Sequence, residues 1–172
     1  MAKWSDPAGP DYATDEPEFM VEYGRAMAEW GNVEHLLARI YVKLLKPANI
    51  EHATLAFFSV QNLRDRMNMI SSLVASQFGE PKVADVPPVV EWERIRNAFN
   101  RTVKNRNTLA HMHVWHGPSI GTFGHGHIYQ VAKLPVDVGE RRQQVVTTKR
   151  LRDFREGFCL LWKRLHLFYE AF

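Results

Sequence analysis

Three side chains of types that can cleave a phosphodiester lie close together in the sequence: Arg106, Asn107 and His111. An arginine guanidinium binds phosphate through two parallel hydrogen bonds. Histidine is the side chain best suited to proton transfer near neutral pH. On a helix, Asn107 and His111 share one flank because they are four residues apart. The three residues could therefore hold a phosphate and move protons without a metal ion.

A helix from about Pro88 to His111 is expected to position these residues. At about 100° per residue its apolar positions form one stripe, made of Trp92, Ile95, Phe99, Val103 and Ala110. Arg106 falls inside this stripe, where a charge is costly unless it is paired or lines a cleft. The pattern therefore predicts one of two environments for Arg106, a cleft or a buried ion pair.

The segment from Arg106 to His111 resembles the Arg-x4-6-His motif of the HEPN superfamily (higher eukaryote and prokaryote nucleotide-binding domains), in which Asn commonly follows the arginine. The long first helix, with Trp30, Glu34, Leu37 and Tyr41, is also similar to the first helix of HEPN-like proteins. The resemblance covers most of residues 18–172. It implies an all-α bundle whose motif lies at the end of the penultimate or last core helix. For many members it implies a metal-independent endoribonuclease, often a toxin or antiviral effector, with an active site formed across a homodimer.

The resemblance also implies roles for the residues. Arg106 would hold the phosphate that an RNA 2′-hydroxyl attacks, His111 would act as general base or acid, and Asn107 would orient one of them. Glu34 could orient Arg106, and no cofactor is implied. The partners would be RNA, a second copy of the chain and an antitoxin protein. The alternative is a non-catalytic HEPN-like module that binds RNA, a nucleotide or a protein, with Arg106 paired to an acid of the first helix.

The whole chain is expected to be mainly α, an antiparallel bundle of four to five helices. The sequence predicts a flexible acidic tail over residues 1–15 and a single helical domain over residues 16–172. The expected helix boundaries follow from caps and breakers: Thr14 or Asp15 to Pro47, Asn49 to Phe57, Ser59 to Gly79, Pro88 to His111, and Thr147 or Thr148 to the C-terminus.

A small β-hairpin flap is predicted over about residues 112–146, before the C-terminal helix, because glycines break any helix there. His113, His125 and His127 lie in this flap. A His-x-His pair on a strand points both rings to one face, so a Zn or Ni site is an alternative function for the flap. The simpler interpretation is a set of exposed or capping histidines, with no metal bound.

Composition limits the class of protein. The chain has 172 residues, 45% hydrophobic and 24% charged, and one cysteine. It has no apolar run of the ~18 residues that a membrane helix needs, and no disulfide scaffold is available to it, so a cytoplasmic protein is expected. Residues 1–34 carry eight acidic and two basic side chains, whereas residues 140–172 carry four and eight. Basic residues at Arg64, Arg66 and Lys104 could guide RNA, although such residues are usually solvated surface.

Overall fold

The structure is a computed structural model that describes residues 17–79, 86–118, 127–133 and 146–172. Side chains are described in residues 17–79, 86–110 and 146–172. The predicted tail over residues 1–15, most of the linker over residues 80–88 and the glycine-rich turn of the flap lie outside these ranges. Within the described ranges, no helix combines the length and the apolar character that a membrane span requires.

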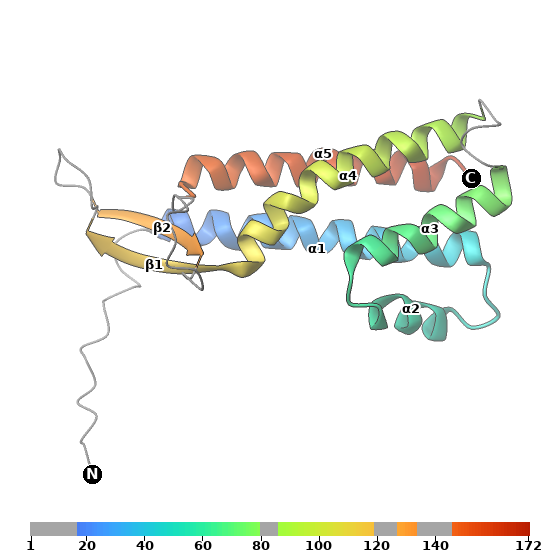
Figure 1. Cartoon of the computed structure of the whole chain (residues 1–172), viewed down its shortest axis with the longest axis horizontal. Coiled ribbons are helices and arrows are strands. Elements are labelled where there is room, and N and C mark those ends of the chain that lie inside the picture. Colours follow the sequence, from blue (N-terminus) through green and yellow to red (C-terminus); the bar gives the residue numbers. More distant parts are fainter. Residues whose placement is uncertain (1–16, 80–85, 119–126, 134–145) are drawn as a thin grey trace, which may run out of the picture.

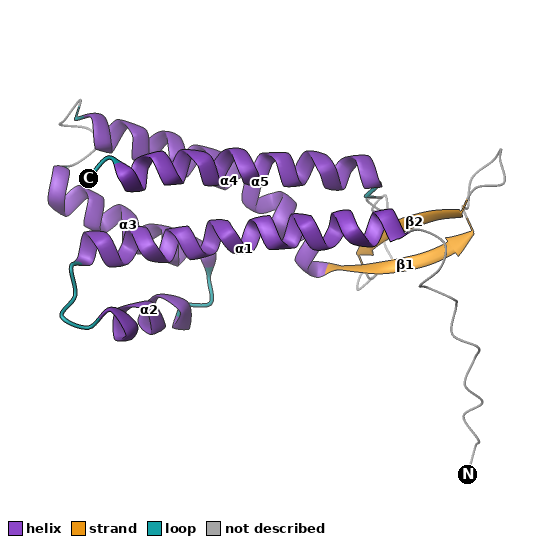
Figure 2. Ribbon diagram, turned by 180° about the vertical axis from the view of Figure 1, so that it is seen from behind, coloured by secondary structure: helices purple, strands orange, loops and turns teal. Residues whose placement is uncertain are grey.

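Five helices account for most of the described chain, as the sequence predicted. They are α1 (Pro17–Leu45), α2 (Ile50–Ser59), α3 (Leu63–Phe78), α4 (Pro87–His111) and α5 (Thr148–Glu170). Between α4 and α5, β1 (Met112–Pro118) pairs with β2 (His127–Lys133) in an antiparallel ribbon. Figure 2 shows this ribbon at one end of the helical bundle.

Side-chain and glycine caps fix several helix ends. The Asn49 side chain accepts a hydrogen bond from the backbone N–H of His52 at 2.9 Å, and Thr147 accepts one from Arg150 at 3.2 Å. Gly79 ends α3 with a φ of 98°, a conformation that glycine adopts without strain. The predicted cap at Ser59 was wrong, because α2 continues through Ser59 and Asn62 caps α3 instead.

Four of the helices form a closed bundle, in which α1 contacts α5, α5 contacts α4, α4 contacts α3 and α3 contacts α1. The short α2 packs on the outside of α1 (Figure 1). It leads the chain back along α1, so α3 runs in the same direction as α1, and α4 then runs in the opposite direction (Figure 1). The predicted antiparallel arrangement therefore holds for α3, α4 and α5 in sequence, whereas α1 lies parallel to its neighbours α3 and α5.

The core is densely aromatic where α1, α4 and α5 meet. The ring of Trp30 lies 5.8 Å from that of Phe99 and 5.3 Å from that of Phe158, measured between centroids. Nearer the C-terminus, Trp92 contacts Phe168 at 5.2 Å. Phe168, near the end of α5, thus contributes to the core.

The buried seam of α4 places Arg106 at a core position. Trp92, Phe99 and Arg106 are spaced seven residues apart, and Leu109 is fully buried while Ala110 is exposed. The expectation that Ala110 is buried was therefore wrong. A bundle seam repeats every 3.5 residues rather than 3.6, so it drifts by about 20° per heptad relative to a straight helix. After two heptads this drift turns Leu109 inward and Ala110 outward.

A buried carboxylate links α1 to α5. Glu22 is only 5% exposed. Its Oε1 accepts a hydrogen bond from Arg25 at 3.0 Å, and Nη1 of Arg155 lies 3.1 Å from its Oε2. One turn earlier on α1, the exposed Glu18 pairs with Arg152 of α5. The same pair of helices therefore carries one buried and one exposed ion pair.

Replacing Glu22 with alanine is expected to lower the free energy of unfolding by about 1–3 kcal/mol, because Arg155 then loses its partner in a largely buried setting. Glu18→Ala is the matched control, with an expected loss of about 0–1 kcal/mol, because both side chains of the Glu18–Arg152 pair are exposed. Urea unfolding followed by circular dichroism measures both. Equal losses in the two variants would contradict this account.

Candidate functional site

A groove between α3 and α4 contains most of the residues that the sequence singled out. Its volume is about 880 Å³. One wall is the start of α3 with the two residues before it, and the other is α4 from Arg96 to Asn107. The lining residues are Gln61, Asn62, Leu63, Arg64, Met67, Asn68, Arg96, Phe99, Asn100, Val103, Lys104, Arg106 and Asn107. The structure thus brings Arg64 and Lys104 to the same groove as Arg106 and Asn107.

The charge of this groove is wholly positive. Its lining includes Arg64, Arg96, Lys104 and Arg106, and none of its lining residues is acidic. Arg96 is paired with Glu93 on its own helix at 2.8 Å. The other three make no ion pair with any carboxylate of the described chain. The groove therefore has the charge that a phosphate backbone needs.

Arg106 has unused hydrogen-bonding capacity. Its side chain is half-buried, and its Nε is buried without a hydrogen-bond partner among the described residues. One terminal nitrogen donates to Oδ1 of Asn107 at 3.3 Å. Of the two environments that the sequence predicted, the structure has the cleft: Arg106 lines the groove and is not held by an ion pair within the described ranges.

Glu34 makes a different contact from the one expected. Its carboxylate lies 3.8 Å from Arg66. The guanidinium of Arg66 also donates to the carbonyl oxygens of Val60 at 2.6 Å and Phe58 at 3.1 Å. These contacts hold Arg66 at the corner between α2 and α3. Its side chain is 11% exposed and does not line the groove. Of the three predicted RNA-guiding residues, Arg66 is thus the one that the structure separates from the groove.

His111 is the last residue of α4. Its side chain lies outside the part of the chain whose side chains are described. The end of the helix itself is held by α1, because the hydroxyl of Tyr23 donates to the carbonyl oxygen of Leu109 at 3.2 Å. This bond joins the last turn of α4 to the first helix. The backbone that carries Arg106 and His111 is therefore anchored to the bundle.

The flap histidines are spread along the ribbon. The strand pairing places His113 opposite Ala132, and His127 opposite Pro118. His127 and Ala132 are five residues apart on one strand, or about 17 Å. That distance does not support a metal site shared by His113 and His127. His125 lies outside the described residues. Where side chains are described, no group of three or more His, Cys, Asp or Glu is gathered as metal ligands.

Sequence reasoning missed several residues of the groove, among them Arg96 and Asn100. The spacing of Arg96, Asn100 and Lys104 at four-residue steps placed them on one helix flank. That signal was readable in the sequence. The contribution of Asn62 and Asn68 was not, because it depends on how α3 packs beside α4.

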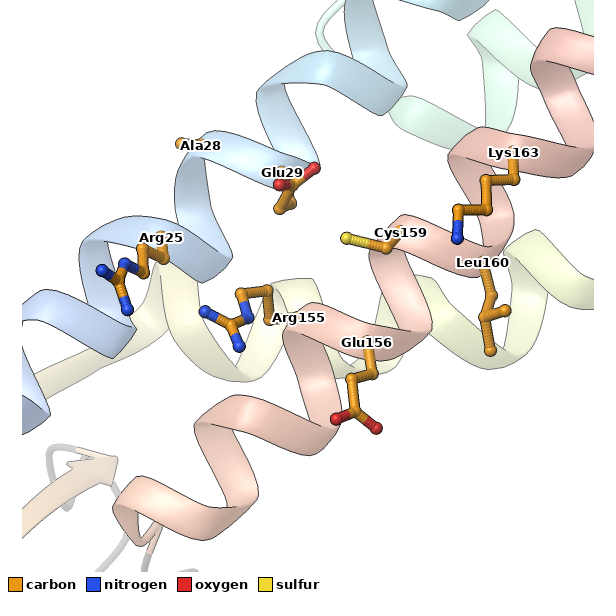
Figure 3. Close-up of a pocket in the computed structure, with 8 residues that line it drawn as sticks. All are labelled: Arg25, Ala28, Glu29, Arg155, Glu156, Cys159, Leu160 and Lys163. Carbon is orange, nitrogen blue, oxygen red and sulfur yellow. The ribbon is translucent and has the colours of Figure 1, made fainter.

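A second groove, of about 660 Å³, lies between α1 and α5 and contains the single cysteine (Figure 3). The charged residues that line it are of both signs: two are acidic, Glu29 and Glu156, and three are basic. Burial, together with the charge and hydrogen bonding of Glu29, raises the pKa of the Cys159 thiol. A thiol with a raised pKa is a poor nucleophile at neutral pH. This groove therefore lacks the uniform positive charge of the groove between α3 and α4, and its thiol is not activated as a nucleophile.

Cys159 is expected to react with iodoacetamide near pH 7.5 more slowly than a free cysteine peptide, because less of it is thiolate. Glu29→Gln removes a charge that disfavours the thiolate, so that variant should react faster. Mass spectrometry of timed reactions measures both rates. Glu156→Gln is the control. A Glu29→Gln rate equal to that of wild type would show that Glu29 does not affect the thiol.

Comparison of the chain with known protein families, curated proteins and solved structures finds no match. The resemblance to the HEPN superfamily therefore rests on the sequence alone, on the motif from Arg106 to His111 and on the pattern of the first helix.

Proposed function

We propose that this protein is a HEPN-like, metal-independent endoribonuclease of toxin or phage-defence type, and that RNA binds in the groove between α3 and α4. The observation that carries the proposal is the state of Arg106. It occupies a core-seam position, yet its Nε has no partner in the described structure and it lines a groove without acidic residues. A buried donor without a partner costs about 1–3 kcal/mol. A phosphate oxygen in the groove would supply the acceptor that this donor lacks.

In the proposed reaction a base removes the proton of an RNA 2′-hydroxyl, and the 2′-oxygen then forms a bond to the adjacent phosphorus. The bond from phosphorus to the 5′-oxygen breaks, and that oxygen takes up a proton. Arg106 binds the phosphate and stabilises the negative charge that develops on it. His111 performs one of the two proton transfers. Asn107, whose Oδ1 accepts a hydrogen bond from Arg106, orients the guanidinium.

Arg64 and Lys104 hold the flanking phosphates, since both line the groove without an ion pair in the described chain. The proposal also includes a homodimer and an antitoxin partner, as the resemblance implies, and a flap that the β1–β2 ribbon forms next to His111. The binding module remains the second candidate. The absence of an ion pair at Arg106 within the described chain favours the enzyme, because the module's arginine was expected to be paired.

Incubating the wild-type protein with a mixed RNA pool in excess EDTA tests the function directly. We expect cleavage that leaves 2′,3′-cyclic phosphate ends. DNA and 2′-O-methyl RNA of the same sequences should resist, because they lack the attacking hydroxyl. Replacing His113, His125 and His127 together with alanine should leave the rate unchanged. Loss of cleavage in EDTA, or cleavage of DNA, would rule out this reaction.

A further inference from the structure

The chain passes directly from α4 into β1. The last residue of α4 is His111, and β1 begins at the next residue, Met112. The last four backbone carbonyls of a helix have no partner within that helix, so those of residues 108–111 need partners from elsewhere. Among the described side chains, one supplies such a bond: the hydroxyl of Tyr23 donates to the carbonyl oxygen of Leu109 at 3.2 Å. Tyr23 therefore caps the end of α4 from another helix.

Tyr23 lies in an otherwise apolar line of residues on α1. Phe19, Tyr23, Met27 and Trp30 follow one another at steps of three and four residues. Phe19 and Trp30 are buried, whereas Tyr23 and Met27 are partly buried and pack against the core. A phenylalanine in place of Tyr23 would fill the same position, so the hydroxyl adds only its hydrogen bond. A tyrosine hydroxyl at the edge of a core needs a partner, and here the partner is the last turn of α4.

Both ends of this hydrogen bond are held by the bundle. It is the only hydrogen bond that a described side chain makes between α1 and α4. On α1, the neighbouring Glu22 is buried and lies 3.1 Å from Arg155 of α5. On α4, the side chain of Leu109 is fully buried. The hydroxyl thus ties the last turn of α4 to a part of α1 that is itself held by α5.

Leu109 lies between the two groups that the proposed reaction uses. Arg106 comes three residues before it and His111 two residues after it, so all three belong to the last two turns of α4. Figure 1 shows the β1–β2 ribbon extending from this end of α4 past the bundle. Helix ends fray more readily than helix centres. A hydrogen bond to Leu109 opposes fraying at the point where Arg106 and His111 must keep their relative positions.

We propose that Tyr23 is a positioning residue for RNA cleavage, because its hydroxyl fixes the last turn of α4. The inference rests on the proposed function, since it takes Arg106 and His111 as the reacting groups. A displacement of about 1 Å in a reacting group can lower a rate about 100-fold. Binding of RNA depends less on this turn, because Arg64 and Lys104 line the groove from outside it. The hydroxyl of Tyr23 therefore affects the rate of cleavage and not the affinity for RNA.

Tyr23→Phe tests the inference, because it removes the hydroxyl and keeps the ring. We expect kcat for cleavage of an RNA oligonucleotide in excess EDTA to fall about 10-fold, while KM changes by less than about 2-fold. Ser71→Ala is the matched control. It removes the acceptor of the 3.0 Å hydrogen bond from Trp92, which joins the other end of α4 to α3. Each variant removes one side-chain hydrogen bond of α4, but only Tyr23→Phe should lose activity.

Hydrogen exchange followed by mass spectrometry locates the change in the same two proteins. The backbone amides near the end of α4 should exchange faster in Tyr23→Phe than in the wild type, because the last turn opens more often. They should exchange at the wild-type rate in Ser71→Ala. This readout reports on the helix end and does not depend on RNA cleavage.

The outcomes separate the inference from the function. A wild-type kcat in Tyr23→Phe, with cleavage by the wild type intact, overturns the positioning role and leaves the ribonuclease standing. An equal loss of kcat in Tyr23→Phe and Ser71→Ala also overturns it, because the loss would then follow from a general loosening of α4. A rise in KM with kcat unchanged, or a loss of kcat without faster exchange at the helix end, overturns it as well. Absence of cleavage by the wild type overturns the proposed function and the inference with it.

Discussion

Replacing Arg106 with alanine is expected to lower the rate of RNA cleavage in EDTA about 10²–10³-fold, the usual loss when one preorganised donor to a developing negative charge is removed. The same change should alter the free energy of unfolding by less than ~1 kcal/mol. Arg106 makes one side-chain hydrogen bond in the described chain, to its neighbour Asn107, and its buried Nε has no partner. Removing an unsatisfied donor relieves a cost, and this relief offsets the lost packing of the side chain.

The combination of a large loss in rate with little change in stability separates this site from a structural arginine. Arg101→Ala is the matched control, because Arg101 is exposed on the same helix and does not line the groove. Arg106→Lys tests the two-pronged contact, since lysine keeps the charge but not the fork geometry. His111→Ala, measured alongside, should also lose activity. Wild-type rates in both Arg106 variants would remove Arg106 from the reaction.

The helices were predictable because their signals are local. Caps at Asn49 and Thr147 and the glycine stop at Gly79 depend on a few adjacent residues. The errors arose where a helix boundary or a helix direction depends on neighbouring elements. Ser59 is a good cap by type, but α2 extends two residues beyond the expected end at Phe57, so Asn62 takes that role. The parallel run of α1 and α3 could not be derived, because it depends on where the short α2 returns the chain.

The candidate site, like the helices, was predictable only where its residues lie close together in the sequence. Arg106 and Asn107 are adjacent in a motif, and the apolar stripe showed that Arg106 was out of place among hydrophobic residues. Glu34 was expected to orient Arg106, and Arg66 to guide RNA. The two instead meet each other at the α2–α3 corner, where Arg66 also lies 5.6 Å from the ring of Phe57. No spacing rule links α1 to that corner. The charge and the periodicity of a sequence predict which residues share a face of one helix. A groove between two helices also depends on which helices are neighbours in the bundle, and those patterns do not predict that.

Trp30→Ala is expected to lower the free energy of unfolding by about 3–5 kcal/mol, the usual cost of truncating a large aromatic side chain in a core. Trp30 is 2% exposed and packs against Phe99 of α4 and Phe158 of α5. Its removal therefore leaves a cavity at the junction of three helices. A domain of this kind is stable by about 5–15 kcal/mol in all. The variant should unfold at a markedly lower urea concentration than wild type.

Two further variants show whether the loss comes from packing. Leu167→Ala should change stability by no more than about 0.5 kcal/mol, because Leu167 is 72% exposed. Trp30→Phe should lose less than Trp30→Ala, since phenylalanine keeps the ring contacts and removes an indole N–H that has no partner in the described core. Because Phe99 lies between Trp30 and the groove, the loosened core should also weaken RNA binding in Trp30→Ala. A Trp30→Ala protein as stable as Leu167→Ala would show that this aromatic junction does not hold the bundle together.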